Sequence, residues 1–463
     1  MRRRVTTASI IQGSGSMAGE GIVIVGAGPA GAAVAIGLAR MGEPVTLVGE
    51  PRRFAAVEGV SARVIEALRA LDVRQALQAF APPSPRRANW DGAYTEANTE
   101  SLVDRQRFDQ GLLEDLQRLG VSVVRGRVTA LHSAPGQHEI EVDTERGRRT
   151  LGADFLVEAR GRAAPGGGVP RVRGVETVSL LQYWQGPPGA AGSAVQSCED
   201  GWVWMAALGD GRRYLQLTID VASTTLPPKK ALGDYCSARF RALEAAEPFV
   251  RDAVPVGEPH ARTSTAVLNE ALVADDWIRV GDAAMAVDPL SGNGIFQALS
   301  SALQAPAVVA TLRHDRSLAA LAQQFHCQRI EHLFYRFARI GRDFYARETR
   351  WPQAPFWAAR RGWPDAEPLH VAVTPDAVSL AHRPVVCDGR IAEADVVVTP
   401  DQPLGVWRVD GILIAPVLHA LRSHGGVGQD GEAEQALLMS RFGFDQLRAR
   451  ALLDWMRAQA WLN

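Results

Sequence analysis

The chain contains 463 residues, of which 46% are hydrophobic, and its formal net charge is −1. This length allows a large hydrophobic core and predicts two or three globular domains. The balanced charge gives no electrostatic footprint for nucleic acid or for an anionic membrane surface, and the sequence contains no run of about 18 apolar residues that would predict a membrane span. We therefore expect neither nucleic acid nor a membrane among its partners.

Residues 1–19 are expected to form a disordered leader. They begin with Met and three arginines but lack the apolar stretch that a secretory signal requires. The run Gly13-Ser14-Gly15-Ser16 is typical of a flexible linker. The four cysteines lie far apart and include no C-x-x-C pair, which favours reduced thiols. Together these features predict a cytoplasmic protein.

A glycine-rich turn follows the first predicted strand. Ile22-Val23-Ile24-Val25 is a short β-branched run typical of a buried parallel strand, and an alanine-rich helix is expected over about 31–40. Glycines at the first, third and sixth positions of the turn allow a tight turn, close approach of a pyrophosphate, and close packing of helix on strand. The helix N-terminus favours the anion. The pattern predicts a dinucleotide site at Gly26, Ala27, Gly28, Pro29, Ala30 and Gly31.

An acidic residue follows the next predicted strand, residues 44–48. Glu50 lies about 20 residues after the last glycine of the turn, where a carboxylate accepts hydrogen bonds from an adenosine ribose. Strand, turn, helix, strand and acid in this register predict a Rossmann-type domain. Residues 20–165 as a whole alternate strand and helix patterns, as a doubly wound sheet does, with a small hairpin over 139–157.

The pattern changes over residues 174–265. Four strand-like runs, 175–183, 194–198, 202–208 and 214–221, follow one another with short turns and no helix between them. This arrangement predicts an antiparallel sheet inserted into the first domain.

A second glycine signal follows this insertion. Residues 277–280 are strand-like, Gly281-Asp282 ends the strand, and residues 295–312 predict one long alanine-rich helix. A carboxylate at a strand end can accept hydrogen bonds from a sugar-alcohol chain. The turn Gly292-Asn293-Gly294 presents backbone N–H groups at a helix N-terminus, where they suit a negative charge. The two glycine signals together predict that this chain holds both ends of an FAD.

The stretch from Gly281-Asp282 through Asp288-Pro289 to Gly294 resembles the GD motif of the p-hydroxybenzoate hydroxylase and flavin-dependent halogenase superfamily. The resemblance covers about residues 20–345. It implies that Asp282 binds the ribityl chain, that Pro289 lies beside the isoalloxazine, and that residues 292–294 face its pyrimidine ring. It also implies that the inserted sheet roofs a substrate pocket over the flavin.

Three weaker positions follow from the same resemblance. The segment Val103-Asp104-Arg105 is similar to a family segment whose arginine lies near the pyrophosphate, which gives Arg105 that role. Residues 154–162 resemble another family segment, although Glu158 and Arg160 replace commoner residues, so only a backbone role is carried over, to Ala159 and Gly161. A contact with the cofactor is also expected at Val128.

The C-terminal part departs from this plan. Residues 351–368, rich in Trp and Pro, predict a linker, and residues 369–463 predict strands at 369–373, 384–386 and 395–398 followed by helices at about 412–423, 431–442 and 444–460. This resembles a small winged-helix-like module. It holds eleven acids, eight arginines and no lysine, which disfavours DNA phosphates. A protein or peptide partner and plain structural support both stay open.

The expected fold class is therefore α/β: a Rossmann-type FAD-binding domain (residues 20–173 and 266–350), an inserted antiparallel-sheet substrate domain (174–265), the linker and the C-terminal module. No second GxGxxG follows a strand, so we expect NAD(P)H to visit the flavin transiently, or a partner reductase to supply reduced flavin. In the resembling family, reduced FAD and dioxygen form a C4a-hydroperoxide that hydroxylates electron-rich aromatic rings. The protein would exclude water and place the ring.

Halogenation is disfavoured. Trp202-Val203-Trp204 begins like the halogenase W-x-W-x-I-P motif, but Ala206-Ala207 replace Ile-Pro, and residues 1–228 contain no lysine to match the halogenase catalytic lysine. Side chains two apart in a strand share a face, so Trp202 and Trp204 either pack within the sheet or line the substrate pocket. No catalytic residue and no metal ligand is assigned, and His326 and His332 on the helix expected over 317–348 are treated as structural.

A halogenase-like sequence without the lysine but with an added C-terminal module resembles the flavin monooxygenases that hydroxylate a tryptophan inside a protein during tryptophylquinone formation. The resemblance implies a protein or peptide substrate, with the γ-subunit precursor of quinohemoprotein amine dehydrogenase as the expected partner. A small-molecule aromatic hydroxylase or halogenase, a reductase of the geranylgeranyl reductase kind and a non-enzymatic escort protein are the alternatives.

Overall fold

The computed structural model describes residues 21–462 except 51, 53, 166, 167, 169, 293 and 425–430. Its first layer is a five-stranded parallel sheet in the order β18-β10-β1-β2-β6. The central strand β1 is buried at all four positions, as its β-branched sequence predicts. The five strands are β1 Ile22–Val25, β2 Val45–Gly49, β6 Ser122–Arg125, β10 Phe155–Glu158 and β18 Trp277–Arg279.

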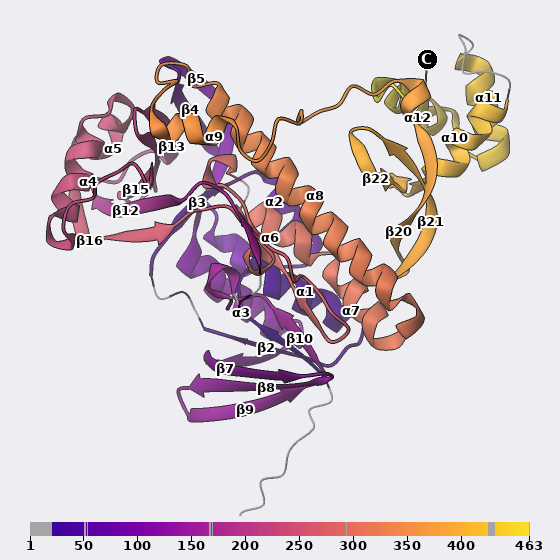
Figure 1. The fold of residues 1–463 in the computed structure, drawn as a ribbon, viewed down its shortest axis with the longest axis horizontal. Coiled ribbons are helices and arrows are strands. Elements are labelled where there is room, and N and C mark those ends of the chain that lie inside the picture. Colours follow the sequence, from indigo (N-terminus) through magenta and orange to yellow (C-terminus); the bar gives the residue numbers. More distant parts are fainter. Residues whose placement is uncertain are drawn as a thin grey trace, which may run out of the picture.

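Different elements cover the two faces of this sheet. Because side chains alternate along a strand, Ile22 and Ile24 of β1 pack in one core with helices α1 (Pro29–Arg40) and α3 (Arg105–Arg118). Val23 and Val25 pack on the other side in a core with an antiparallel sheet of β7 (Arg127–Ala134), β8 (Gln137–Thr144) and β9 (Gly147–Ala153) (Figure 1). The hairpin expected over 139–157 is therefore present, with a third strand.

The second layer is an eight-stranded sheet in the order β16-β12-β15-β14-β13-β4-β5-β3. The four strands expected after residue 174 are present as an antiparallel run. The members of the sheet are β3 Val57–Val60, β4 Ser84–Trp90, β5 Ala93–Asp104, β12 Thr177–Gln185, β13 Gly192–Cys198, β14 Gly201–Ala207, β15 Arg212–Asp220 and β16 Val254–Thr263.

Strands β3, β4 and β5 correct the expectation of a doubly wound sheet throughout residues 20–165. They join the second sheet instead, where β4 lies parallel to β13. This pairing of β4 with β13 joins segments far apart in the chain. Strands β4 and β5 themselves form a hairpin whose turn residues Asp91 and Gly92 have φ values of 55° and 74°, the left-handed conformation that tight hairpins require. The eight-stranded sheet is thus assembled from both sides of residue 174.

Helices α4 (Leu232–Arg241) and α5 (Glu247–Val250) cover one face of this large sheet, where they share a core with Val203 and Met205 of β14. The opposite face of β14 turns towards the parallel-sheet domain. Smaller elements join the two layers: α2 Ala62–Ala70, β11 Arg171–Arg173, β17 Val267–Asn269 and β19 Met285–Ala286.

The single helix expected over 295–312 is two helices, α6 (Gly294–Ala302) and α7 (Ala305–His314). The break precedes Pro306, which has no N–H to donate to the preceding turn. The stretch Gly294–His314 is the one described helical segment long and apolar enough to cross a membrane, but 72% of that apolar window is buried inside the fold. Next comes α8 (Ala319–Ala346), the longest helix of the described chain.

Residues 351–368 do not form the free linker that their composition predicted. They contain helix α9 (Pro355–Arg361), and Trp357 is fully buried against the large sheet. Its Nε1 donates to the carbonyl oxygens of Cys198 and Glu199 at 3.1 and 3.0 Å. The aromatic residues that suggested a linker are therefore core residues, and the extended crossing to the C-terminal module begins only after α9 (Figure 1).

The C-terminal region is α+β, as expected. A three-stranded antiparallel sheet and a two-stranded hairpin precede three helices, which share one core with Val397 of β21. The strand expected at 369–373 is absent from the described structure, where these residues are coil, and the likeness to a winged helix stays a prediction. The elements are β20 Ser379–Cys387, β21 Arg390–Thr399, β22 Gln402–Val406, β23 Arg408–Val409, β24 Ile412–Leu413, α10 Ile414–Ser423, α11 Gly431–Phe442 and α12 Gln446–Ala458.

The module is fixed to the rest of the protein through its sheet. Ile391 of β21 is fully buried in the main core, and its N–H donates to Thr311 Oγ1 of α7 at 2.8 Å. Strands β20 and β21 also contact α8 (Figure 1).

Candidate active site

The first glycine turn leaves open space at the N-terminus of α1. Gly28 is the N-cap residue and Pro29 follows it in the first turn of the helix. A Cβ on Gly31 would lie 1.9 Å from the carbonyl oxygen of Gly26, so the turn and helix approach too closely for any side chain there. A Cβ on Gly28, in contrast, would meet nothing within 4 Å. The geometry fits a pyrophosphate in front of unpaired helix N–H groups.

The residue expected to bind ribose lies beside this turn. Glu50 directly follows β2, the neighbour of β1, and is exposed. A Cβ on Gly49 would lie 2.4 Å from Ala27 Cβ, which shows how closely the end of β2 approaches the turn.

The second glycine signal packs directly on the first. Gly281 has a φ of 58°, and a Cβ there would lie 2.7 Å from Ala30 Cβ at the start of α1. Its N–H donates to Ser301 Oγ of α6 at 2.9 Å. Gly161 lies on the other side, where its Cβ would be 3.9 Å from Asp282 Cβ. Two motifs far apart in the sequence therefore form one continuous surface.

Asp282 extends from this surface towards the cavity described below. Its carboxylate lies 3.6 Å from Arg162 Nε. Burial raises the pKa of the Asp282 carboxyl, and the positive charge of Arg162 opposes that rise. The side chain is placed to accept hydrogen bonds from a polar ligand held between the two motifs.

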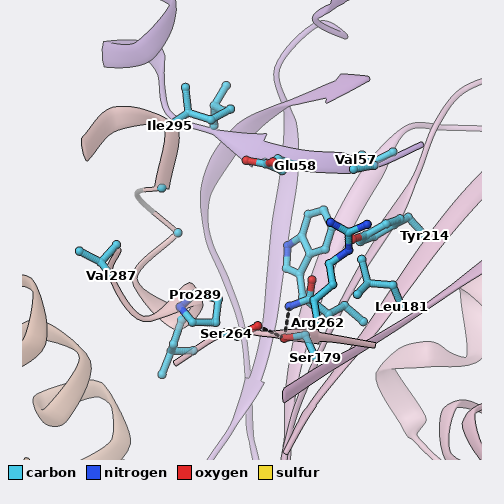
Figure 2. A pocket seen from close by; sticks show the side chains of 18 of the residues that line it. Val57, Glu58, Ser179, Leu181, Tyr214, Arg262, Ser264, Val287, Pro289 and Ile295 are labelled. Atoms are coloured by element: carbon cyan, nitrogen blue, oxygen red, sulfur yellow. Dashed lines mark hydrogen bonds between the residues drawn. The ribbon is translucent and has the colours of Figure 1, made fainter. Parts of the chain in front are cut away.

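A cavity of about 290 Å³ lies between the two layers of the protein. Figure 2 shows Pro289, Val287 and Ile295 on one side of it, with Leu181, Tyr214 and Arg262 of the large sheet facing them. The lining from the parallel-sheet domain includes Asp282, Asp288, Pro289, Leu290, Gly292 and Gly294. The lining from the large sheet includes Leu181, Val195, Trp202, Trp204, Tyr214, Gln216 and Arg262.

Trp202 and Trp204 therefore both face the cavity. Trp202 is buried, and its Nε1 donates to Tyr345 Oη of α8 at 3.3 Å. Tyr345 in turn donates to the Asp288 carboxylate at 3.0 and 3.1 Å, and that carboxylate accepts from Leu290 N at 2.9 Å. This chain of hydrogen bonds connects the aromatic wall to the turn that contains Pro289. Burial raises the pKa values of both Asp288 and Tyr345.

Trp204 belongs to an aromatic group on the same face. Its ring lies 5.7 Å from that of Tyr214, which lies 5.5 Å from that of Tyr183, both in edge contact. Arg262 of β16 completes this wall, with its guanidinium over the Phe54 ring at 3.3 Å. Burial, together with the charge of Arg52, lowers the pKa of Arg262.

The other expected cofactor residues are Arg105, Val128 and Asn293. Arg105 is buried and does not line the cavity, because its guanidinium pairs with Glu58 and with Asp109, the latter at 3.0 Å. These carboxylates raise its pKa against the effect of burial. Val128 packs on the outer face of the parallel sheet in β7. Asn293 lies outside the described residues.

The sequence did not single out Tyr345, Tyr214, Gln216 or Arg262. The sequence places these four residues only within the alternating patterns of strands and helices. Many core residues share those patterns, so nothing distinguished these four as site residues. No group of three or more His, Cys, Asp or Glu residues in the described chain is arranged to hold a metal ion.

Comparison with known proteins places this geometry in a family. The family model for lycopene cyclase protein matches residues 21–182. The structure of the peptidyl tryptophan dihydroxylase QhpG, essential for tryptophylquinone cofactor biogenesis, matches with a TM-score of 0.81 and 52% sequence identity over 95% of this chain and 99% of that one. This chain belongs to the QhpG family. The match covers nearly all of both chains, so it extends over the C-terminal module as well.

More distant relatives agree with this assignment. The putative FAD-dependent oxidoreductase LodB of Marinomonas mediterranea is 26% identical over 379 residues, 74% of this chain and 96% of that protein. Tryptophan 2-halogenase of Chondromyces crocatus is 27% identical over 374 residues, 73% of this chain and 70% of that protein. This member of the QhpG family is therefore an FAD-dependent oxidoreductase of the flavin monooxygenase class.

Proposed function

We propose that this protein hydroxylates a tryptophan side chain within a protein precursor during tryptophylquinone biogenesis. The observation that carries the proposal is the cavity, which has the second glycine motif on one wall and the aromatic residues of a sheet on the other. The 52% identity to a peptidyl tryptophan dihydroxylase supports the choice of substrate.

FAD would be held by the two motifs that meet at Ala30 and Gly281. The open space at Gly28 would take the pyrophosphate, Glu50 the ribose, and Asp282 the ribityl chain. Pro289 and the turn at 292–294 would contact the isoalloxazine. When bound and reduced, FAD supplies activated dioxygen, from which one oxygen atom is transferred to an electron-rich ring.

The residues of the chain would position the ring and exclude water. Leu181, Val195 and Leu290 give the cavity apolar walls, and Trp202 and Trp204 present flat surfaces against which an indole can pack. The hydrogen bonds from Trp202 through Tyr345 to Asp288 hold the aromatic wall at a fixed distance from the flavin-side turn. A fixed separation is what an oxygen transfer between two bound rings requires.

The partner and the electron donor belong to the same proposal. We propose the γ-subunit precursor of quinohemoprotein amine dehydrogenase as the protein substrate, hydroxylated in the cytoplasm before export. NAD(P)H would reduce the flavin transiently, since the sequence contains no second GxGxxG after a strand. The C-terminal module would help to hold the folded precursor.

A second candidate is the hydroxylation of a free aromatic acid such as tryptophan. Arg262 lines the cavity, and its Nε has no hydrogen-bond partner among the described residues. An unpaired guanidinium would suit the carboxylate of a small substrate, which a tryptophan inside a protein does not have.

The rate of NADH consumption with different substrates distinguishes the two candidate functions. The FAD-loaded protein would be mixed in air with the γ-subunit precursor, with the same precursor carrying phenylalanine in place of the target tryptophan, or with free tryptophan. We expect stimulation by the intact precursor only. Equal stimulation by free tryptophan would favour the second candidate, and stimulation by the phenylalanine precursor would exclude tryptophan as the oxidised ring.

A further inference from the structure

Gln216 is the polar residue at the centre of the aromatic wall. It lies in β15, directly opposite Trp204 of β14 on one side and Leu181 of β12 on the other. Neighbouring residues in register present their side chains on the same face of a sheet. Gln216 therefore lines the cavity between an indole ring and an aliphatic side chain.

The amide of Gln216 is hydrogen-bonded to two hydroxyl groups. Its Nε2 donates to Ser179 Oγ at 3.3 Å and to Thr218 Oγ1 at 3.2 Å, which uses both N–H bonds. Ser179 is itself fixed by hydrogen bonds of 3.1 Å to Thr218 and 2.6 Å to Ser264. Figure 2 shows hydrogen bonds at Ser179, which lies in this wall near Pro289.

This orientation leaves the carbonyl oxygen of Gln216 available. In the part of the chain that the structure describes, no group donates a hydrogen bond to Gln216 Oε1, and the atom is open to the cavity. Its neighbours in register, Trp204 and Leu181, offer aromatic and aliphatic surface, so the oxygen is an acceptor beside a surface on which a ring can pack. A ligand that carries an N–H or O–H group on its ring can donate a hydrogen bond to it.

We propose that Gln216 determines substrate specificity by accepting a hydrogen bond from the indole N–H of the tryptophan that is hydroxylated. This inference rests on the proposed function. It specifies which edge of the indole ring the site recognises, namely the edge that carries the N–H group. A site that hydrogen-bonds a substrate N–H rejects an analogue without it strongly, because the acceptor is then buried without a partner. The contact also sets the rotation of the ring in its plane, and so determines which carbon faces the flavin-side turn.

The test combines one change in the enzyme with one change in the substrate. The FAD-loaded wild type and the Gln216→Leu variant would each receive two precursors, one with tryptophan and one with 3-benzothienylalanine, in which sulfur replaces the indole N–H. We expect the wild type to prefer the tryptophan precursor at least about 10-fold in kcat/KM, and the variant to lose this preference to within about threefold.

Two further variants keep the test decisive. Gln216→Glu retains an oxygen acceptor, so it should keep a preference for the tryptophan precursor even where Gln216→Leu folds poorly. Gln196→Leu makes the same chemical change on the outer face of the sheet, where Gln196 Oε1 accepts from Ala245 N, and should leave the preference unchanged.

The outcomes separate this inference from the proposed function. A wild type that hydroxylates both precursors with equal kcat/KM would overturn the role of Gln216 and leave the proposed function intact, as would a Gln216→Leu variant that keeps the full preference. A wild type that hydroxylates neither precursor would overturn the proposed function, and this inference with it.

Discussion

The two walls of the cavity are built in different ways. The flavin-side wall comes from two contiguous motifs, each a strand followed by a turn and a helix, and the motifs meet at Ala30 and Gly281. The substrate-side wall comes from single side chains on separate strands of the large sheet, among them β12, β13, β14, β15 and β16, none adjacent in sequence to those of another strand. Backbone atoms form most of the flavin-side wall, and side chains form all of the substrate-side wall.

The difference fits what the proposed function requires each wall to bind. Phosphates and sugars are recognised by backbone N–H groups and by one carboxylate at a strand end, so their site needs a particular local backbone that only certain short sequences form. An aromatic ring is recognised by surface and by a few polar atoms, which any strand can present on its inner face. The flavin-side wall is therefore sensitive to backbone changes and the substrate-side wall to side-chain chemistry.

The largest effect is expected from Gly31→Val. A Cβ at this position would lie 1.9 Å from the carbonyl oxygen of Gly26, so α1 must move away from β1. We expect a loss of about 4 kcal/mol or more in the free energy of unfolding, and little FAD in the purified protein. Urea denaturation measures the free energy of unfolding, and the flavin absorbance per protein measures the FAD content. Stability equal to that of the wild type would contradict the close approach.

The second-largest effect is expected at acidic pH, where the titration of His326 lowers the free energy of unfolding. This residue is buried on α8, and its Nε2 donates to the carbonyl oxygen of Arg279 in β18 at 2.9 Å. The hydrogen bond connects α8 to the parallel sheet. Burial lowers its pKa to about 4. Since the unfolded imidazole titrates near 6.5, the unfolded state binds the proton first, and stability present above pH 6.5 is lost as the pH falls towards 4.

We expect this group to contribute roughly 3 kcal/mol to that loss. Urea denaturation at pH 7 and pH 4.5 would measure it, with His326→Gln as the matched variant because an amide keeps an N–H for Arg279. A variant whose stability falls as steeply as that of the wild type would show that His326 is not the titrating group.

Gly28→Val separates cofactor binding from folding. A Cβ at Gly28 meets no protein atom within 4 Å, yet it would occupy the space in front of α1. We expect the FAD dissociation constant to rise about 100-fold, equivalent to about 2.7 kcal/mol, while the thermal stability of the FAD-free protein stays within error of the wild type. Unchanged affinity for FAD would place the pyrophosphate elsewhere.

The smallest effect is expected from Tyr345→Phe, which tests the connection between the walls. The change removes the hydroxyl that accepts from Trp202 and donates to Asp288. We expect FAD to bind normally and kcat/KM for the precursor to fall about 10-fold, because one lost hydrogen bond of this kind leaves an unpaired buried group. A loss of FAD comparable to that of Gly28→Val would assign Tyr345 to the cofactor site instead.

The two motifs that meet at Ala30 and Gly281 could be located from the sequence, because Gly26 to Gly31 and Gly281-Asp282 carry backbone requirements that few other folds impose; their contacts with FAD stay a prediction. It predicted the strands of the inserted sheet but not the addition of β3, β4 and β5, since pairing between β4 and β13 joins segments far apart in the chain. Gln216 and Tyr345 had no distinguishing local pattern, and their roles arise only where the strands and α8 come together. Trp357 was assigned to a linker because composition does not show which surface a tryptophan will cover.

The most direct test of a tryptophan-hydroxylating site is the intact mass of the precursor after reaction. The FAD-loaded protein, NADH and the crosslinked γ-subunit precursor would be incubated in air, and the precursor analysed by mass spectrometry with fragmentation. A gain of one or two oxygen atoms, located on the target tryptophan, is the predicted result. An unchanged precursor mass, from protein whose bound flavin is reduced by NADH and reoxidised by air, would contradict a protein-directed hydroxylase.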